Sequence, residues 1–124
     1  MTDILVGVVV AHGAVAEALV GAAEEISGIR GALIPVSNAG LGRADLEERL
    51  VSAVGERRAV IFVDLPSGSC LFAAMRGLPA RENVRVVTGV NLVMLLDFLF
   101  HREEEIAAAA RRAAEAGARA ISER

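Results

Sequence analysis

The sequence predicts one α/β domain, with an open, mainly parallel sheet and helices on both of its faces. Short, uninterrupted runs of aliphatic residues alternate along the chain with longer segments whose apolar residues recur at helical spacing. A strand buried on both faces has such a run, and the helices between parallel strands cover the two faces of the sheet. A chain of 124 residues is long enough for one real core, so we expect residues 1–124 to form a single domain.

Four strands and five helices are expected. The predicted strands cover residues 4–11, 31–36, 59–63 and 84–89, and the predicted helices cover residues 14–26, 42–54, 70–78, 92–100 and 103–121. In the first helix, the side chains expected to face the core are those of Val15, Ala18, Leu19, Ala22 and Ile26.

Composition excludes several classes of protein. The net charge is −3, so no basic field favours nucleic acid. A single cysteine fits a reducing compartment, and no apolar run approaches the roughly 18 residues of a membrane span. We therefore expect a cytoplasmic protein that does not insert into a membrane. No His, Cys, Asp or Glu cluster has the spacing of metal ligands, and no nucleotide-binding glycine motif is present, so neither a metal nor a cofactor is expected.

The predicted topology brings polar residues together at one edge of the sheet. Right-handed crossovers place the loops that follow parallel strands on the same edge, where open α/β sheets bind ligands. His12, Asn38, the loop of residues 64–69, and Asn91 each follow a predicted strand. We expect these residues to line one site.

His12 is the candidate nucleophile of this site. A helix is expected to begin just after it, and the positive end of a helix opposes protonation of an imidazole and attracts phosphate. Gly13 has no side chain to block an approaching phosphoryl group. A neutral histidine there is suited to phosphoryl transfer. The alternative is that His12 only forms the turn or caps the helix.

Asp64 and the residues after it are candidates for supporting roles. If the first and third strands are neighbours, the Asp64 carboxylate can accept a hydrogen bond from His12 and fix the tautomer of the ring. Ser67, Gly68 and Ser69 can hold phosphoryl oxygens with their N–H and hydroxyl groups. Asp64 as a turn residue, and the triplet as an ordinary loop, remain open as alternatives.

Three ordered motifs carry a resemblance to a known family. They are Ala11-His12-Gly13, Val63-Asp64 with the later Gly68-Ser69, and Gly89-Val90-Asn91 with Met94-Leu95. This pattern resembles the mannose/fructose-type IIA component of the bacterial phosphoenolpyruvate:sugar phosphotransferase system, over nearly the whole chain. The resemblance implies the strand order 2-1-3-4, phosphorylation of His12, pairing of His12 with Asp64, and a site floor shaped by residues 89–91.

The resemblance also implies partners. His12 would accept phosphate from phospho-HPr and pass it to a histidine of a IIB protein during sugar uptake. Members of the family are commonly homodimers, some of which exchange a C-terminal strand, so residues 119–124 are a candidate antiparallel edge strand. Apolar candidates for the docking rim are Leu41, Leu65, Leu71 and Met94, and the alternative for each is a place in the core or on the ordinary surface.

Three other functions are alternatives to that of a phosphoryl carrier in sugar uptake. The same module can regulate another protein by binding, without sugar transport, and the sequence does not separate the two roles or name the sugar. A response-regulator receiver phosphorylated on Asp64 is rejected, because acidic residues after the first strand and a lysine are missing. A serine hydrolase using Ser69 is rejected, because the chain lacks the G-x-S-x-G motif.

Overall fold

A four-stranded parallel sheet forms the centre of the molecule. The computed structural model describes residues 4–78 and 82–124. The strands are β1 (Val6–Ala11), β2 (Leu33–Ser37), β3 (Ala59–Val63) and β4 (Val84–Thr88), in the spatial order β2-β1-β3-β4. The predicted α/β class and the strand order 2-1-3-4 are thus confirmed.

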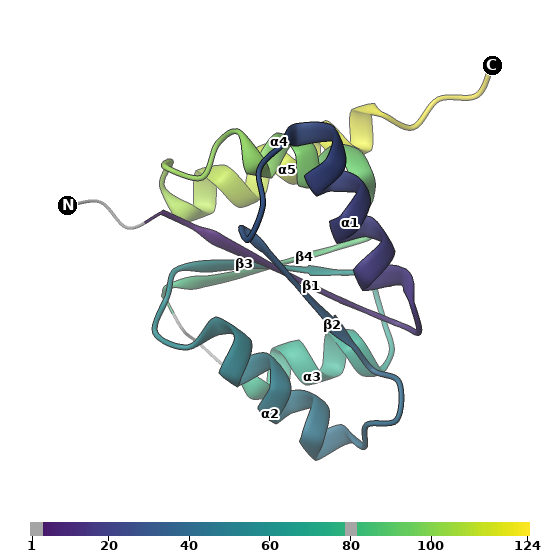
Figure 1. Cartoon of the computed structure of the whole chain (residues 1–124), viewed down its shortest axis with the longest axis vertical. Helices are drawn as coiled ribbons and strands as arrows, with labels where there is room; N and C mark the ends of the chain where they lie inside the picture. Colours follow the sequence, from purple (N-terminus) through teal and green to yellow (C-terminus); the bar gives the residue numbers. More distant parts are fainter. Residues whose placement is uncertain (1–3, 79–81) are drawn as a thin grey trace.

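Helices cover both faces of this sheet. Helices α1 (Val15–Ser27), α4 (Leu92–Leu99) and α5 (Ile106–Arg119) lie on one face, and α2 (Arg43–Val54) and α3 (Ser69–Gly77) lie on the other (Figure 1). Among the described residues, no helix is long and apolar enough to cross a bilayer.

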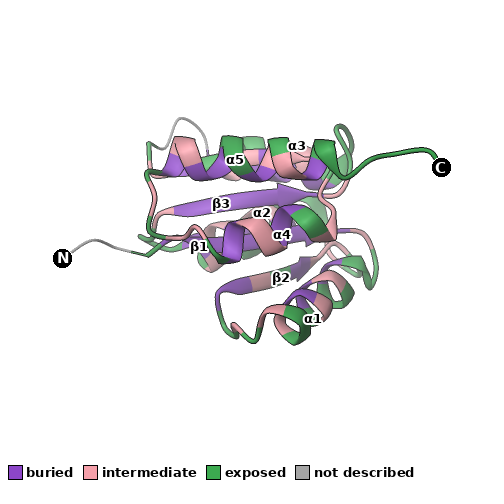
Figure 2. Cartoon of the chain, turned by 90° about the horizontal axis from the view of Figure 1, so that it is seen from above, coloured by how far each residue is buried: buried purple, intermediate pink, exposed green. Residues whose placement is uncertain are grey.

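The central strand β1 supplies side chains to a core on each side of the sheet. Val9 packs with Phe62 and Phe98 on the α1, α4 and α5 side, whereas Val8 and Val10 pack on the α2 and α3 side. Figure 2 shows the strands buried between helices whose outer surfaces are exposed. Burial of alternate side chains on both faces is why the sequence of β1 is an unbroken aliphatic run.

The inward face of α1 differs from the prediction. Ala16, Val20 and Ala23 are buried, whereas Val15 and Ile26 are 45% and 62% exposed. Apolar residues occupy much of the circumference of this helix, so periodicity alone does not select one stripe. The stripe with two alanines faces inward, and its small side chains let the helix lie close to the sheet.

The candidate C-terminal strand is a second difference. Residues 120–124 form no strand and are exposed, and the described part of the chain contains no antiparallel strand in its sheet. After α5 the chain projects away from the body of the molecule (Figure 1). Because residues 120–124 (the C-terminal tail) do not lie along β4, the prediction of an antiparallel edge strand is wrong for the single chain.

Candidate active site at the carboxyl edge of the sheet

The parallel pairing of β1 and β3 positions the two central residues of the site. Val10 lies opposite Val63 in the register, and the Asp64 N–H donates to the Val10 carbonyl at 3.3 Å. His12 follows the last residue of β1, and Asp64 follows the last residue of β3. Two residues that are 52 positions apart therefore begin neighbouring loops at the same edge.

The Asp64 carboxylate holds both the ring and the backbone of His12. Its Oδ2 lies 2.7 Å from His12 Nδ1 and accepts the His12 backbone N–H at 2.9 Å. Its Oδ1 accepts the Leu65 N–H at 2.9 Å. An ionised carboxylate can only accept, so Nδ1 carries the ring proton in this pair. The neutral ring then has its free lone pair on Nε2.

Hydrogen bonding keeps Asp64 ionised. Burial raises the pKa of this carboxyl, but the hydrogen bonds and charge of His12, together with the hydrogen bond from the Leu65 N–H, outweigh burial and leave its pKa below the ordinary value of 3.8. Asp64 is therefore a carboxylate at neutral pH and can stabilise a positive charge on the ring.

The Nε2 side of the ring faces the start of α3. Ser69, the first residue of this helix, has its Oγ 3.5 Å from Nε2, and the His12 side chain is 43% exposed. The first backbone bond of the helix runs from the Phe72 N–H to the Gly68 carbonyl. The earlier N–H groups of α3 precede this ladder and point outward from the helix start, where an anion is favoured. The helix that presents its positive end to Nε2 is thus α3.

The loop that carries His12 is fixed by the end of β2. Asn38 Oδ1 accepts the Gly13 N–H at 3.2 Å, and the Ser37 hydroxyl donates to the Gly13 carbonyl at 2.7 Å. Asn38 therefore lies beside the site and supports its loop. The Gly13 N–H already has a partner, so a phosphoryl oxygen would have to compete with Asn38 for it. Ser37 was not singled out from the sequence, although its place at a strand end was the available signal.

The remaining predicted residues lie in different settings. Ser67 and Gly68 are exposed in the loop before α3, and Gly68 has a φ of +98°, a conformation that favours glycine. Asn91 caps α4 by accepting the Met94 N–H at 3.0 Å, and it donates to the Gly117 carbonyl at 3.1 Å. The two polar atoms of the Asn91 amide thus join α4 to α5, and its role in the floor of the site stays a prediction.

Cys70, which is not part of the sequence motifs named above, is a neighbour of the His12–Asp64 pair. Its Sγ lies 3.8 Å from His12 Nδ1, and the residue is fully buried at the start of α3. Burial, and then the negative charge of Asp64, raise the pKa of this thiol. Ligand atoms of His12, Asp64 and Cys70 lie within 4.8 Å of one another. Spacing along the chain predicts no such cluster, because the fold alone assembles it.

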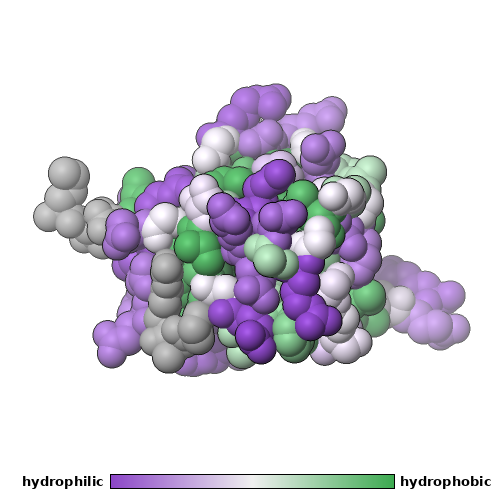
Figure 3. All heavy atoms as spheres, turned by 90° about the horizontal axis from the view of Figure 1, so that it is seen from below, coloured by the Kyte–Doolittle hydropathy of each residue, from purple (hydrophilic) through white to green (hydrophobic). Residues whose placement is uncertain are grey.

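Exposed apolar side chains flank the site. Leu65 is 51% exposed and Phe72 is 40% exposed, with the guanidinium groups of Arg43 and Arg76 at 4.6 and 5.5 Å from the Phe72 ring centre. Of the other rim candidates, Leu41 and Leu71 are half-buried. Met94 is 7% exposed and belongs to the core, which was the alternative to a place on the rim. On the α2 and α3 side, apolar spots are separated by hydrophilic ones (Figure 3).

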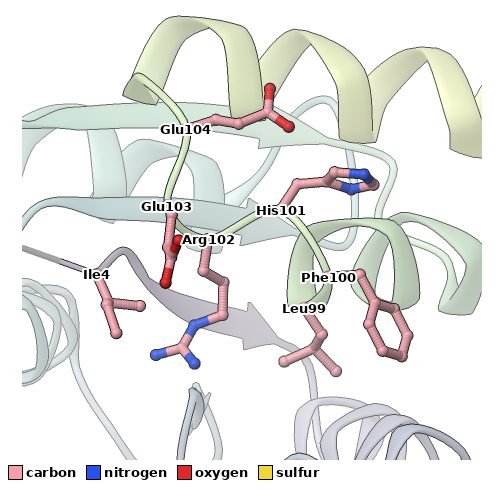
Figure 4. A pocket seen from close by; sticks show the side chains of 7 residues that line it. All are labelled: Ile4, Leu99, Phe100, His101, Arg102, Glu103 and Glu104. Atoms are coloured by element: carbon pink, nitrogen blue, oxygen red, sulfur yellow. The ribbon is translucent and has the colours of Figure 1, made fainter.

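A hollow of about 450 Å³ lies at the opposite edge of the sheet, between the start of β1 and the segment after α4. Its lining includes Ile4, Phe100, His101 and Arg102 (Figure 4). The His101 ring and the Arg102 guanidinium point in different directions, and each bonds a backbone carbonyl. His101 Nδ1 bonds the Asp97 carbonyl at 2.7 Å, and Arg102 Nε donates to the Leu5 carbonyl at 2.8 Å. These side chains do not converge on a ligand position.

The fold and the site together define an open α/β domain that presents a histidine, fixed by a carboxylate, at the switch point of its sheet. A family model described as "PTS system fructose IIA component" matches residues 7–115. The chain therefore belongs to the fructose/mannose IIA family of the sugar phosphotransferase system, as the sequence motifs indicated, and its role is of the phosphotransferase type.

Solved structures support the same fold. The phosphotransferase component EIIA from Streptococcus agalactiae has a TM-score of 0.89 at 19% identity, with 97% of each chain covered. The mannose/sorbose-specific IIA subunit from Enterococcus faecalis has a TM-score of 0.83 at 23% identity, covering 99% of this chain and 95% of that one. A sigma-54 interaction domain protein from Enterococcus faecalis has a TM-score of 0.80 at 11% identity, covering 97% and 95%. No curated protein matches the chain.

Proposed function

We propose that this protein is a phosphoryl carrier that accepts phosphate from phospho-HPr on Nε2 of His12 and passes it to a histidine of a IIB partner. The observation that carries the proposal is the 2.7 Å contact between His12 Nδ1 and Asp64 Oδ2, which leaves Nε2 as the nucleophilic atom. The His12 side chain is 43% exposed, which supports access of a docking protein to the ring.

In the proposed step, the lone pair of Nε2 attacks the phosphorus of the donor phosphohistidine. The new N–P bond forms as the donor N–P bond breaks, and that electron pair remains on the donor ring nitrogen. The Nδ1 proton of His12 stays in place, so the phosphorylated ring becomes cationic beside the Asp64 carboxylate. Transfer to the IIB histidine reverses these roles.

The start of α3 supports the phosphoryl group in this proposal. The hydroxyl of Ser69 lies on the Nε2 side of the ring, and the N–H groups at the start of a nine-residue helix favour an anion there. Ser67 and Gly68 are proposed to shape the entry to this position, and Gly13 to leave room beside the ring. The exposed Leu65 and Phe72 side chains offer the carrier an apolar contact.

The test is phosphorylation by a reconstituted relay of phosphoenolpyruvate, enzyme I and HPr, followed by intact-mass measurement. We expect the addition of one phosphoryl group that is labile to acid and stable to base. The His12→Ala variant should acquire none. The chain contains one other histidine, so His101→Ala is the matched control and should be phosphorylated normally. Phosphorylation of His12→Ala to the same extent would contradict the proposal.

A second candidate is that the same phosphohistidine module acts as a regulator, by binding a protein rather than by serving sugar uptake. The likeness in fold to the sigma-54 interaction domain protein supports this candidate at the level of architecture. Deletion of the gene separates the two roles. Loss of uptake of a sugar, restored by the wild-type chain and not by His12→Ala, supports transport, whereas unchanged uptake with altered gene expression supports regulation.

A further inference from the structure

We propose that His12, Asp64 and Cys70 bind a thiophilic divalent cation, with Zn²⁺ as the fitting ion, and that the bound ion prevents phosphorylation. The proposal assigns regulation to the site of the proposed function. The claim that zinc prevents phosphorylation rests on that function, whereas the claim that zinc binds does not. The binding half stands on geometry alone.

The three side chains offer an imidazole nitrogen, a carboxylate oxygen and a thiol sulfur, which are the ligands that Zn²⁺ takes in proteins. These ligand atoms lie within 4.8 Å of one another. Tetrahedral Zn²⁺ places a nitrogen and a sulfur ligand about 3.5 Å apart, and His12 Nδ1 lies 3.8 Å from Cys70 Sγ.

The carboxylate has to move slightly for the ion to enter. Asp64 Oδ2 is 2.7 Å from His12 Nδ1, whereas two such ligands of one zinc ion lie about 3.4 Å apart. Asp64 begins the loop that precedes α3, and the exposed His12 ring can turn away from it. Three protein ligands then leave a fourth position for water, as in open zinc sites.

Metal binding and phosphorylation would require opposite tautomers of the ring. With zinc on Nδ1, the ring proton is carried by Nε2, whose lone pair is no longer available to attack phosphorus. The Nδ1 proton is lost and one is gained at Nε2, so the net release is the single proton of the Cys70 thiol. By linkage, phosphorylation of His12 must weaken zinc binding by the same factor.

Binding is tested first, with the phosphate-free protein. Titration with Zn²⁺ against a chromophoric indicator should give one site per chain. Titration with Co²⁺ as a spectroscopic probe should give a thiolate-to-cobalt charge-transfer band. Cys70→Ala and Asp64→Asn should each weaken zinc binding tenfold or more, and Cys70→Ala should abolish the cobalt band. Circular dichroism and thermal melting check that both variants are folded.

His101→Ala is the matched control. His101 also faces a carboxylate, with Nδ1 3.7 Å from Asp97 Oδ1, but the single cysteine of the sequence lies beside His12 instead. This variant should keep wild-type zinc affinity. Unchanged affinity in Cys70→Ala, or a cobalt complex without the charge-transfer band in the wild type, would overturn the assignment.

Inhibition is tested with phosphorylated HPr prepared in advance and separated from enzyme I, so that zinc acts only on the last transfer. The measured quantity is the ratio of phosphorylation rates with and without Zn²⁺, in which any change in basal rate cancels. The ratio should fall tenfold or more for the wild type and stay near one for Cys70→Ala.

If the wild type is never phosphorylated, the proposed function fails while the titrations stand. If it is phosphorylated but binds no zinc, only this inference fails.

Discussion

At the scale of single residues, one oxygen atom does most to define the site. Asp64 Oδ2 accepts both the ring N–H and the backbone N–H of His12, so it fixes the tautomer of the ring and the path of the loop together. The sequence predicted the pairing of these side chains once the two strands were taken as neighbours. It did not predict the backbone bond, because that bond depends on the register between β1 and β3 rather than on residue type.

Asp64→Asn should slow phosphorylation by HPr by roughly 10²–10⁴-fold. The amide removes the charge that stabilises the phosphorylated ring, and its NH₂ group can donate to Nδ1 and favour the wrong tautomer. Rates from rapid-mixing and intact-mass measurements check this. The matched control is Asp97→Asn, since Asp97 faces the other histidine, and it should transfer at the wild-type rate. Equal slowing of both variants would refute the role of Asp64.

The lowered pKa of Asp64 predicts a specific dependence of stability on pH. Burial raises this pKa, but His12 and the Leu65 N–H together lower it more, so the folded value lies below the ordinary value of 3.8. The ionised group therefore stabilises the fold above the unfolded pKa, and this contribution is lost as the pH falls through the folded pKa. The free energy of unfolding of wild type minus that of Asp64→Asn, from urea titrations, should shrink from about pH 5 downward. A difference that stays constant or grows would contradict the assignment.

At the scale of elements, helix starts decide where polar groups point. Residues 103–121 were expected to be helical, yet α5 begins at Ile106, because the Glu105 side chain accepts the N–H groups of Ala107 and Ala108 and caps the helix. Likewise α3 begins at Ser69 rather than Cys70. Alanine content and periodicity predicted both helices, but they do not mark the residue at which a cap forms.

Asn91→Ala should destabilise the protein by about 2 kcal/mol, from the loss of the α4 cap and of one hydrogen bond to the Gly117 carbonyl. Asn91→Ser keeps a capping oxygen and loses the bond to α5 without placing a second acceptor beside the Gly117 carbonyl, so its loss should be smaller. Urea unfolding at neutral pH measures both variants. An alanine variant as stable as the wild type would mean that this bridge between α4 and α5 contributes nothing.

At the scale of the whole molecule, the centre of the sheet has no spare room. A Cβ added at Gly7 in β1 would lie 2.6 Å from Leu33 Cδ2 and 2.9 Å from Phe98 Cε2. Gly7→Ala should therefore cost about 1–3 kcal/mol by overpacking. The matched control is Gly21→Ala in α1, which has open space around it and should gain up to about 1 kcal/mol. Chemical denaturation measures both, and equal effects would contradict the packing argument.

The assembly of the protein remains a prediction from the family resemblance. We expect a homodimer, and light scattering in line with gel filtration should report twice the mass of one chain. Strand β4 has a free edge in the described sheet, and Ile121 in the tail is 78% exposed. Removal of residues 120–124 should yield monomers if the tail is exchanged between subunits. A dimer that survives this truncation uses another surface, and a monomeric wild type refutes the prediction.

The pattern of apolar residues predicted the layers and the elements that carry the site, because it records strand burial and helix periodicity. The strand order was implied by the family resemblance instead. The pattern did not predict the inward stripe of α1, where Val15 lies outside and Ala16 inside, because several stripes of that helix are apolar. Nor did it predict the approach of Cys70 to His12. Both depend on how closely packed elements approach, which a one-dimensional pattern does not record.

The shared register of β1 and β3 restricts how this chain can diverge. His12 and Asp64 follow their strands without a spacer, with Val10 opposite Val63. One amino acid inserted into either strand would turn the following side chain to the other face of the sheet. The length of these two strands is therefore constrained separately from their packing. Aliphatic exchanges that keep side-chain volume leave the register unchanged, whereas the gain or loss of one codon in β1 or β3 would separate His12 from Asp64.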